Sequence, residues 1–311
     1  MTITAHHTRE AWLAARSEGE AIGCSDLAAL LGVSRFRGPW DVYAERVLGQ
    51  RAEPTTSQES DRRRGQALER YVLDEYAFRT GYRLSGVGEY LIATNPEIPW
   101  LRGSPDALVL TPDGTGPGTD EGGVDAKTSR DAWEWATDGA EIEAWSAGSE
   151  RMLPPDMALQ GYGYMALTGR AWWDFAVLLP FYDVRCIRLH RDERVIASVL
   201  ETAGRLVQHH LVERHPPDLD ASEACKRAVA ARWEANRAEA LAAKATPDAT
   251  PEQAVAALAY AQAHAAAKEA EEAKGRAANV LRDALRGAYG VRVGALKVTH
   301  GNGGLRLAGG R

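Results

Sequence analysis

The sequence has few cysteines, no long apolar run and no excess of positive charge, and each absence excludes a class of protein. The three cysteines, Cys24, Cys186 and Cys225, are scattered and form no CxxC pair. They therefore predict neither a disulfide framework nor a four-cysteine zinc or iron–sulfur site. No apolar run approaches the length that crosses a bilayer, and the chain start lacks the apolar centre of a signal peptide. We expect a cytoplasmic protein with no membrane partner.

Acidic residues outnumber basic ones, 43 to 37, which gives a formal net charge of −6. This balance argues against a nucleic-acid-binding protein whose whole surface is basic. It leaves room for a local basic groove, and arginines do cluster at 62–64. The 311 residues are 45% hydrophobic and 26% charged, as in soluble globular proteins. The length suits one sizeable domain with an appendage, or two domains.

Apolar periodicity, proline and glycine divide the first two thirds of the chain into alternating helices and strands. We expect helices at about 8–17, 39–49, 60–80, 154–169 and 190–214, and strands at about 82–94, 106–111, 122–129, 171–180 and 182–190. The tryptophan-rich, acidic segment 130–153 has no clear assignment. The elements predict an α/β (α+β) core.

The composition changes after the two prolines at 216–217. Residues 219–287 are rich in alanine and charge, and the break at Thr246–Pro251 predicts a hairpin of two long helices. The tail contains two short strand-like pieces around the Gly-Asn-Gly-Gly sequence at 301–304, which indicates a β-hairpin. The predicted domains are a core at 1–215, a helical hairpin at 219–287 and a short tail at 288–311.

The most informative stretch runs from Trp100 to Ser129 and reads as two strands joined by a glycine-rich loop at 111–123. Asp106 opens the first strand, and Asp125 and Lys127 lie two apart on the second, so their side chains share a face. Two carboxylates and an ammonium at a sheet edge suit a divalent-metal site, to which the backbone carbonyl of Ala126 adds a further oxygen. Mg²⁺, with Mn²⁺ as a substitute, prefers such ligands.

An Asp-x-Lys pair alone arises by chance in most proteins, and the Ser-Pro-Asp sequence at 104–106 makes chance a weaker account here. Two helical residues join the candidate site if the fold is right. Glu69 lies on the helix before the sheet, beside apolar residues that look buried, and Gln160 lies on the helix after it. Each of these two, taken singly, is more simply read as ordinary helix polarity.

Together these pieces resemble the YqaJ-type viral recombinase family, which includes lambda exonuclease and belongs to the PD-(D/E)xK nuclease superfamily. The resemblance covers roughly residues 8–190 and implies a restriction-endonuclease-like core, with a central mixed sheet flanked by helices and a metal site at one sheet edge. The ordered set that carries it is Trp12, Arg16, Ile22–Asp26, Gly65 with Glu69, Ser104–Asp106, Asp125–Lys127, Gln160, Tyr164–Ala166 and Gly169.

The resemblance also implies roles for individual residues. Asp106 and Asp125 match the metal-binding acids and Lys127 the catalytic lysine, and Asp125 stands where Glu is commoner. Glu69 matches an accessory acid, and Gln160 matches a polar residue that lines the active site. A final pair, Ser25 and less closely Arg16 because of a longer spacer, matches residues that hold the 5′-phosphate of DNA, for which a hydroxyl and a guanidinium are suited.

The resulting hypothesis is a Mg²⁺-dependent exonuclease of phage recombination type, acting in a bacterial host. It would digest duplex DNA from an end, 5′ to 3′, and leave a 3′ single strand for an annealing protein. The family resemblance adds a ring-like homo-oligomer as a candidate assembly. Two alternatives stay open: an endonuclease or flap-trimming nuclease of the same superfamily, and a non-catalytic DNA-binding or assembly module on a nuclease core. The intact set of two acids and a lysine argues against the second.

Overall fold

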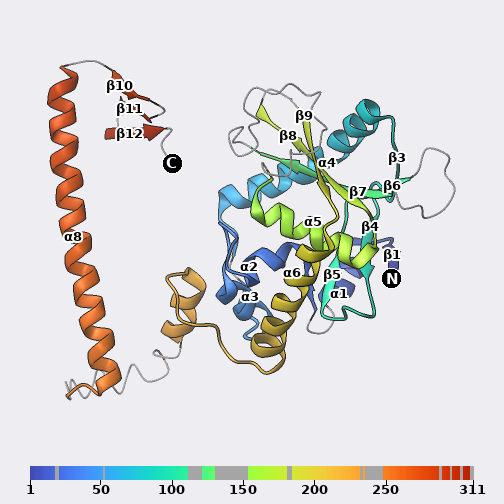
Figure 1. Ribbon diagram of the computed structural model, residues 1–311, viewed down its shortest axis with the longest axis horizontal. Helices are drawn as coiled ribbons and strands as arrows, with labels where there is room; N and C mark the ends of the chain where they lie inside the picture. The colour runs from blue at the N-terminus through green and yellow to red at the C-terminus, as the bar shows by residue number, and fades with distance from the viewer. Residues whose placement is uncertain are drawn as a thin grey trace. The chain divides into compact units, whose positions relative to one another are not determined.

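Figure 1 shows the computed structural model of the chain. The structure describes residues 1–17, 21–51, 53–110, 121–129, 153–180, 184–231, 234, 248–286, 289–294, 296–301 and 304–308. The predicted segment 130–153 and the glycine-rich loop 111–123 lie mostly outside these residues. No helix among those described is long and apolar enough for a membrane span.

The chain divides into two units, Met1–Asn236 and Arg237–Arg311. The division falls later than the domain limit expected near residue 215. The reason is that residues 223–231 form a helix whose side chains pack against helix α3 (Pro39–Arg46). This small cluster consists of Trp40, Tyr43, Ala44, Ala224, Cys225 and Ala228.

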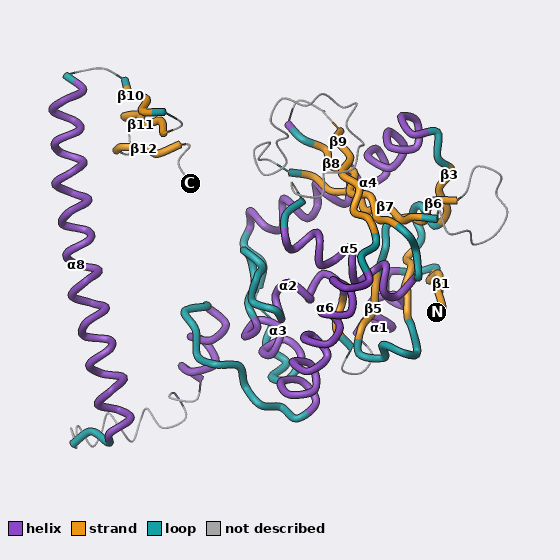
Figure 2. Tube along the Cα trace, in the orientation of Figure 1, coloured by secondary structure: helices purple, strands orange, loops and turns teal. Residues whose placement is uncertain are grey.

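The first unit is built on a five-stranded mixed sheet in the order β3-β6-β7-β8-β9 (Figure 2). Its strands are Arg83–Ser85, Ala107–Leu110, Gly122–Thr128, Trp172–Leu178 and Val184–His190. All neighbours are antiparallel except β7 and β8, which are parallel, with Asp125 beside Phe175. A parallel pair needs a crossover connection, and helix α5 (Pro155–Thr168) lies within it.

Helices cover both faces of this sheet, as predicted. Helix α4 (Thr56–Thr80) packs Val72, Leu73 and Tyr76 on the face that carries Val124 and Ala176. Helix α5 covers the opposite face, and its buried side chains belong to the larger core that also contains Trp173, Phe175 and Val177. Because neighbouring residues of β8 point to opposite faces, this strand, buried along its whole length, contributes to both cores. The expected mixed sheet flanked by helices is confirmed.

Two glycines allow β7 to lie directly against β8. A Cβ on Gly122 would meet the Trp172 ring at 2.2 Å, and a Cβ on Gly123 would meet the Trp173 ring at 2.3 Å. No ring can move that far in a close-packed core, so any side chain at either position would push the strands apart. The start of β7 therefore fixes the register of the residues that follow, Asp125 and Lys127 among them.

A second, four-stranded sheet has the order β1-β4-β5-β2, with strands Thr2–His6, Tyr90–Thr94, Leu101–Gly103 and Ile22–Gly23. The single strand predicted at 82–94 is wrong, because β3 and β4 belong to different sheets. Gly86 and Gly88 between them have φ of +80° and +77°, a left-handed conformation that ends an extended run. β1 and β2 were not predicted.

Besides the helix at 223–231, further helical elements complete the first unit. They are α1 (Arg9–Ser17), η1 (Cys24–Asp26), α2 (Leu27–Leu30), α6 (Glu193–Leu206) and η5 (Val207–Val212), the last being one turn of π-helix. The helix predicted at 190–214 is thus α6 continued by η5. Its buried side chains, such as Ile196 and Leu211, join the larger core.

The second unit contains α8 (Pro251–Leu285) and an antiparallel sheet of β10 (Gly290–Val293), β11 (Leu296–Gly301) and β12 (Gly304–Ala308). Thr250 caps α8 by accepting the Gln253 N–H, and Pro251 occupies the first helical position. Among the described residues of α8 none is buried. The rest of the predicted first hairpin helix, beyond 231, lies largely outside the described residues.

Candidate active site

The paired strands β6 and β7 bring Asp106 and Asp125 together. Ala107 stands opposite Val124 in the antiparallel register, which places Asp106, the residue before β6, opposite Asp125. Oδ2 of Asp106 accepts the backbone N–H of Ala126 at 2.8 Å. The predicted convergence of the two acids is therefore found, although Asp106 precedes β6 and does not belong to it.

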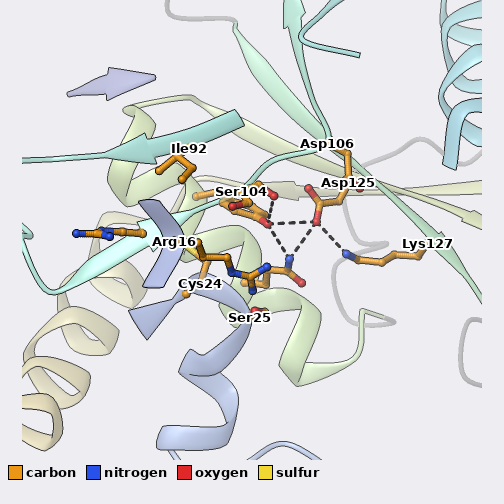
Figure 3. A pocket seen from close by; sticks show the side chains of 12 residues that line it. Arg16, Cys24, Ser25, Ile92, Ser104, Asp106, Asp125 and Lys127 are labelled. Carbon is orange, nitrogen blue, oxygen red and sulfur yellow. Dashed lines mark hydrogen bonds and ion pairs between the residues drawn. The ribbon is translucent and has the colours of Figure 1, made fainter. Parts of the chain in front are cut away.

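Asp125 is almost completely buried, with 1% of its surface exposed, and one of its oxygens is the centre of a hydrogen-bond network. Oδ2 accepts from Lys127 Nζ at 2.9 Å and from Gln160 Nε2 at 3.0 Å (Figure 3). The second amide hydrogen of Gln160 goes to the Tyr164 hydroxyl at 2.8 Å, and that hydroxyl donates to the Ser104 carbonyl at 3.0 Å. A residue of α5 thus orients the carboxylate of β7.

The other oxygen of Asp125 is different. Among the described residues, Oδ1 of Asp125 is buried and has no hydrogen-bond partner. A buried carboxylate oxygen in that state costs roughly 1–3 kcal/mol unless another group satisfies it. The orphaned oxygen points to a ligand for this site.

Burial and neighbouring charges shift the pKa values of Asp106 and Lys127. Burial raises the pKa of Asp106 well above its ordinary value, and the charge of Asp125 raises it further. Burial alone would lower the pKa of Lys127, but Asp125 and Asp106 raise it more, so the ammonium keeps its proton. The site without a cation is therefore a region of excess negative charge.

Glu69 of α4 contributes to this charge. Partial burial raises the pKa of Glu69, the negative charge of Asp125 raises it further, and Lys127 lowers it. Glu69 lies outside the residues that line the pocket described next. Glu69 is thus an electrostatic neighbour of the acids, and its role as an accessory acid stays a prediction.

A cavity of about 110 Å³ opens beside these groups. Its lining combines the predicted acids, lysine and glutamine with the two predicted phosphate-binding residues. The lining residues are Arg16, Gly23, Cys24, Ser25, Ile92, Arg102, Ser104, Asp106, Asp125, Lys127, Gln160 and Tyr164. The same cavity is therefore lined by two acids and a lysine and also by a guanidinium and a hydroxyl.

Close packing brings the segment of Ser25 to this cavity. A Cβ on Gly163 of α5 would meet Leu27 at 2.8 Å and the Cys24 sulfur at 2.9 Å, so glycine lets η1 approach α5. Arg16 reaches the same place from α1, where its guanidinium carbon lies 5.1 Å from the centre of the Trp12 ring. The longer spacer between Arg16 and Ser25 does not keep them from lining one cavity.

The residues fit a hard divalent cation. Asp125 Oδ1 is unpaired, Asp106 lies opposite it, and both supply carboxylate oxygen. In an extended strand the N–H and C=O of one residue point to the same side, so the Ala126 carbonyl faces the side of Asp106, which accepts its N–H. Three converging oxygens are the ligands that Mg²⁺ and Mn²⁺ prefer.

Sequence reasoning missed some of the lining. Tyr164 had no predicted role, although it lies four residues after Gln160 on one face of α5, a spacing that could have indicated it. Arg102 lines the cavity and its guanidinium donates to the Ala15 carbonyl, which fixes the end of α1. Arg102 has no local sequence signal, because only the pairing of β5 with β2 and β4 brings it here.

Another buried ion pair belongs to the opposite face of the sheet. Asp174, fully buried, accepts two hydrogen bonds from Arg188, both at 2.8 Å, and one from the Tyr76 hydroxyl at 2.7 Å. Arg188 also stacks on the Trp172 ring at 3.6 Å. Every oxygen of Asp174 is thus satisfied, unlike Oδ1 of Asp125, and the pair has a packing role.

Comparison with known proteins places the site in a wider context. The model of a family described as the YqaJ-like viral recombinase domain matches residues 11–171. An alkaline exonuclease from Laribacter hongkongensis is 23% identical, with a TM-score of 0.48 over 66% of this chain and 93% of that chain. A phage-related exonuclease from Haemophilus somnus 129PT is 16% identical, with a TM-score of 0.42 over 63% and 96%. No curated protein matches. The span 11–171 contains every residue predicted for the site, from Arg16 to Gln160.

Proposed function

The chain belongs to the YqaJ-like viral recombinase family, and from this premise we propose that it is a divalent-metal-dependent exonuclease that digests duplex DNA from an end. One observation carries the proposal: Asp106, Asp125 and Lys127 converge at a cavity that Arg16 and Ser25 also line. Two acids can hold a cation that activates water for phosphodiester hydrolysis, and the lysine can stabilise the charge that develops; the arginine and hydroxyl suit a terminal phosphate.

Asp106, Asp125 and the Ala126 carbonyl would hold Mg²⁺, or Mn²⁺ in its place. Bound there, the cation supplies Lewis-acid chemistry: it acidifies water and neutralises charge that develops on the scissile phosphate. Gln160 fixes the orientation of the Asp125 carboxylate through its 3.0 Å hydrogen bond, so that Oδ1 faces the ligand. Glu69 adds negative charge on the side of α4.

Lys127 acts as a proton-holding group. The neighbouring carboxylates keep its pKa above the ordinary value, so its ammonium donates hydrogen bonds and does not take a proton from water. In this role Lys127 orients the attacking water and stabilises the negative charge of the phosphoryl oxygens. Its 2.9 Å bond to Asp125 fixes the direction of the ammonium before substrate arrives.

Arg16 and Ser25 would hold the 5′-phosphate of the strand that is cut, which gives digestion from 5′ to 3′. The product is a 3′ single strand, the substrate of an annealing protein, and we propose such a protein as the partner in a bacterial host.

Most contacts to DNA would be to phosphates, so binding is insensitive to sequence and weakens with salt. A ring-like homo-oligomer would keep the enzyme on its strand, and light scattering after size-exclusion chromatography measures that assembly.

The test is digestion of linear and of covalently closed duplex DNA, each with Mg²⁺ and with a chelator. We expect the linear DNA alone to be degraded, and only with the metal. Asp125→Ala and Lys127→Ala should each lose about a hundredfold or more of the rate. A matched control is Lys226→Ala, because Lys226 is exposed and pairs only with its helical neighbour Glu223 at 2.6 Å among the contacts described.

Three outcomes would overturn the proposal. Digestion of closed circles would identify an endonuclease, and DNA binding with no digestion in either metal would identify a non-catalytic module. Wild-type rates in Asp125→Ala and Lys127→Ala would remove these residues from the site. A duplex with a nuclease-resistant linkage at one end only, 5′ or 3′, reports the direction separately.

A further inference from the structure

A second group of metal-ligating side chains lies far along the chain from the acids, at the C-terminal end of α6 and η5. Oε2 of Glu213 lies 3.5 Å from Nδ1 of His209 and 3.4 Å from Nδ1 of His215. One ligand atom from each of the three residues lies within 4.8 Å of the other two. All three side chains are exposed and accessible to an ion from solvent.

The backbone brings these residues together by an unusual helix end. The turn η5 is a π-helix, and past it the Glu213 N–H donates to the Gln208 carbonyl at 2.9 Å and the His215 N–H to the His209 carbonyl at 3.1 Å. Arg214 between them has φ of +60°, a left-handed conformation that is uncommon for a residue with a side chain. The chain therefore turns back, and the rings of His209 and His215 lie 4.6 Å apart.

Helix α3 holds this turn in place. The Tyr43 hydroxyl donates to the Arg214 carbonyl at 3.0 Å, and the Trp40 indole N–H donates to the Asp218 carbonyl at 2.7 Å. On the inner side of the turn, Val207 and Leu211 are buried in the larger core. The positions of the three ligand residues are thus fixed by contacts that involve none of the ligand atoms.

One neighbouring side chain orients a ligand, and a second holds the backbone of the turn. Gln208 Nε2 donates to Oε1 of Glu213 at 3.1 Å, which leaves Oε2 directed at both imidazoles. The Nδ1–H of His210 donates to the His215 carbonyl at 2.8 Å. The Gln208 bond is an outer hydrogen bond of the kind typical of a metal-ligating carboxylate. The unpaired carbonyls of a helix C-terminus also favour a positive charge.

The spacing of the ligand atoms matches a tetrahedral transition-metal site. With bonds of about 2.0–2.1 Å, the ligands of tetrahedral zinc lie about 3.3–3.4 Å apart. Two of the three distances, 3.5 and 3.4 Å, are close to this value, and all three ligand atoms lie within 4.8 Å of one another.

We propose that His209, Glu213 and His215 form a site for a divalent transition metal of the Zn²⁺ class, with a fourth position left for water. Two imidazole nitrogens and one carboxylate oxygen select Zn²⁺, Co²⁺ or Ni²⁺ over Mg²⁺, which prefers the all-oxygen set at Asp106 and Asp125. The bound ion would link the last turn of η5 to the segment that leads out of the first unit's core, and so lock that chain reversal.

The test is calorimetric titration of Zn²⁺ into the full chain, without a polyhistidine tag, in the presence of saturating Mg²⁺. The double variant His209→Ala/His215→Ala should bind one equivalent of Zn²⁺ fewer than wild type. The matched control His7→Ala/His264→Ala removes two exposed histidines from elsewhere and should keep that equivalent. DNA digestion should be unchanged in both double variants, because none of these residues lines the active-site cavity.

Two further measurements separate a built site from a chance cluster. Gln208→Ala removes only an outer hydrogen bond and should weaken zinc binding about tenfold. Co²⁺ bound to wild type should give the intense visible absorption of tetrahedral cobalt, and the double histidine variant should not. Equal zinc stoichiometry in wild type and the double variant, or no effect of Gln208→Ala, would overturn the proposal. Both readouts are independent of nuclease activity.

Discussion

Replacing Asp106 by Asn should stabilise the metal-free protein and remove most of its response to Mg²⁺. Oδ2 of Asp106 accepts the Ala126 N–H at 2.8 Å, and the amide oxygen of Asn can accept the same bond, so the substitution removes charge and little else. Burial and the charge of Asp125 raise the pKa of Asp106. The folded protein therefore binds this proton more tightly than the unfolded chain. The free energy of unfolding of the protein falls as pH rises. The fall begins near pH 3.9, which is about the ordinary pKa of an aspartate, and continues through the raised pKa of Asp106.

The size of the effect follows from the partial burial of Asp106. Neutralising one acid of this charged cluster should raise the free energy of unfolding by about 1–2 kcal/mol near neutral pH. This is the lower end of the range for buried charges, because Asp106 is only partly buried. For a unit of this size that corresponds to a Tm increase of about 2–8 °C. Mg²⁺ at a hundred times its Kd stabilises wild type by about 2.7 kcal/mol. The variant, lacking one of the two acids, should gain little of this.

The assay is differential scanning calorimetry in EDTA and in excess Mg²⁺, repeated from about pH 5 to about pH 8. Asp74→Asn is the control, since Asp74 lies exposed on α4 and pairs only with Arg70 at 2.9 Å among the contacts described. The advantage of Asp106→Asn in EDTA should grow with pH. A lower Tm than wild type in EDTA would refute the electrostatic reasoning. A wild-type response to Mg²⁺ would refute Asp106 as a ligand.

Three other predictions concern the same cavity. Gln160→Leu removes a hydrogen bond to the Asp125 carboxylate and should lower the free energy of unfolding by about 1.5–3 kcal/mol. Urea unfolding measures this change, and an unchanged midpoint would contradict the stabilising role of the Gln160 hydrogen bond. Lys127→Met should keep the Mg²⁺-induced Tm increase while hydrolysis falls about a hundredfold or more, and loss of both would assign Lys127 to metal binding. Ser25→Ala should slow digestion of DNA with 5′-phosphorylated ends and leave digestion from 5′-hydroxyl ends unaffected. An equal loss of rate on both substrates would show that Ser25 does not bind the 5′-phosphate.

The convergence of the central site residues was predictable because this part of the site is local. Asp125 and Lys127 lie two apart on one strand, and strand alternation alone places them on one face. Asp106 follows once the two strands pair, since a short connection makes them neighbours. The end of α4 was equally accessible, because Gly81 marks its stop; its start was not, since α4 begins at Thr56 and the predicted helix began at about 60.

Other parts depend on contacts that no local pattern contains. The parallel strand β2 has two residues, too few for a period, and exists only because β5 lies beside it. The left-handed glycines at 86 and 88 look like ordinary loop residues in the sequence, yet they send β3 and β4 into separate sheets. The left-handed turn at Arg214 is likewise imposed by the Tyr43 contact and not by a glycine.

The parallel pairing of β7 with β8 has a consequence for the order of events during synthesis of the protein. The β6–β7 hairpin is local and can form as soon as it leaves the ribosome, bringing Asp106 and Asp125 together. Gln160 reaches Asp125 only after α5 docks, and α5 docks on a face that β8 must first complete. A nascent chain that stops before Leu178 therefore carries the acids without the group that orients them. Under the proposed function, competence to cut DNA would be acquired late, when β8 closes the crossover.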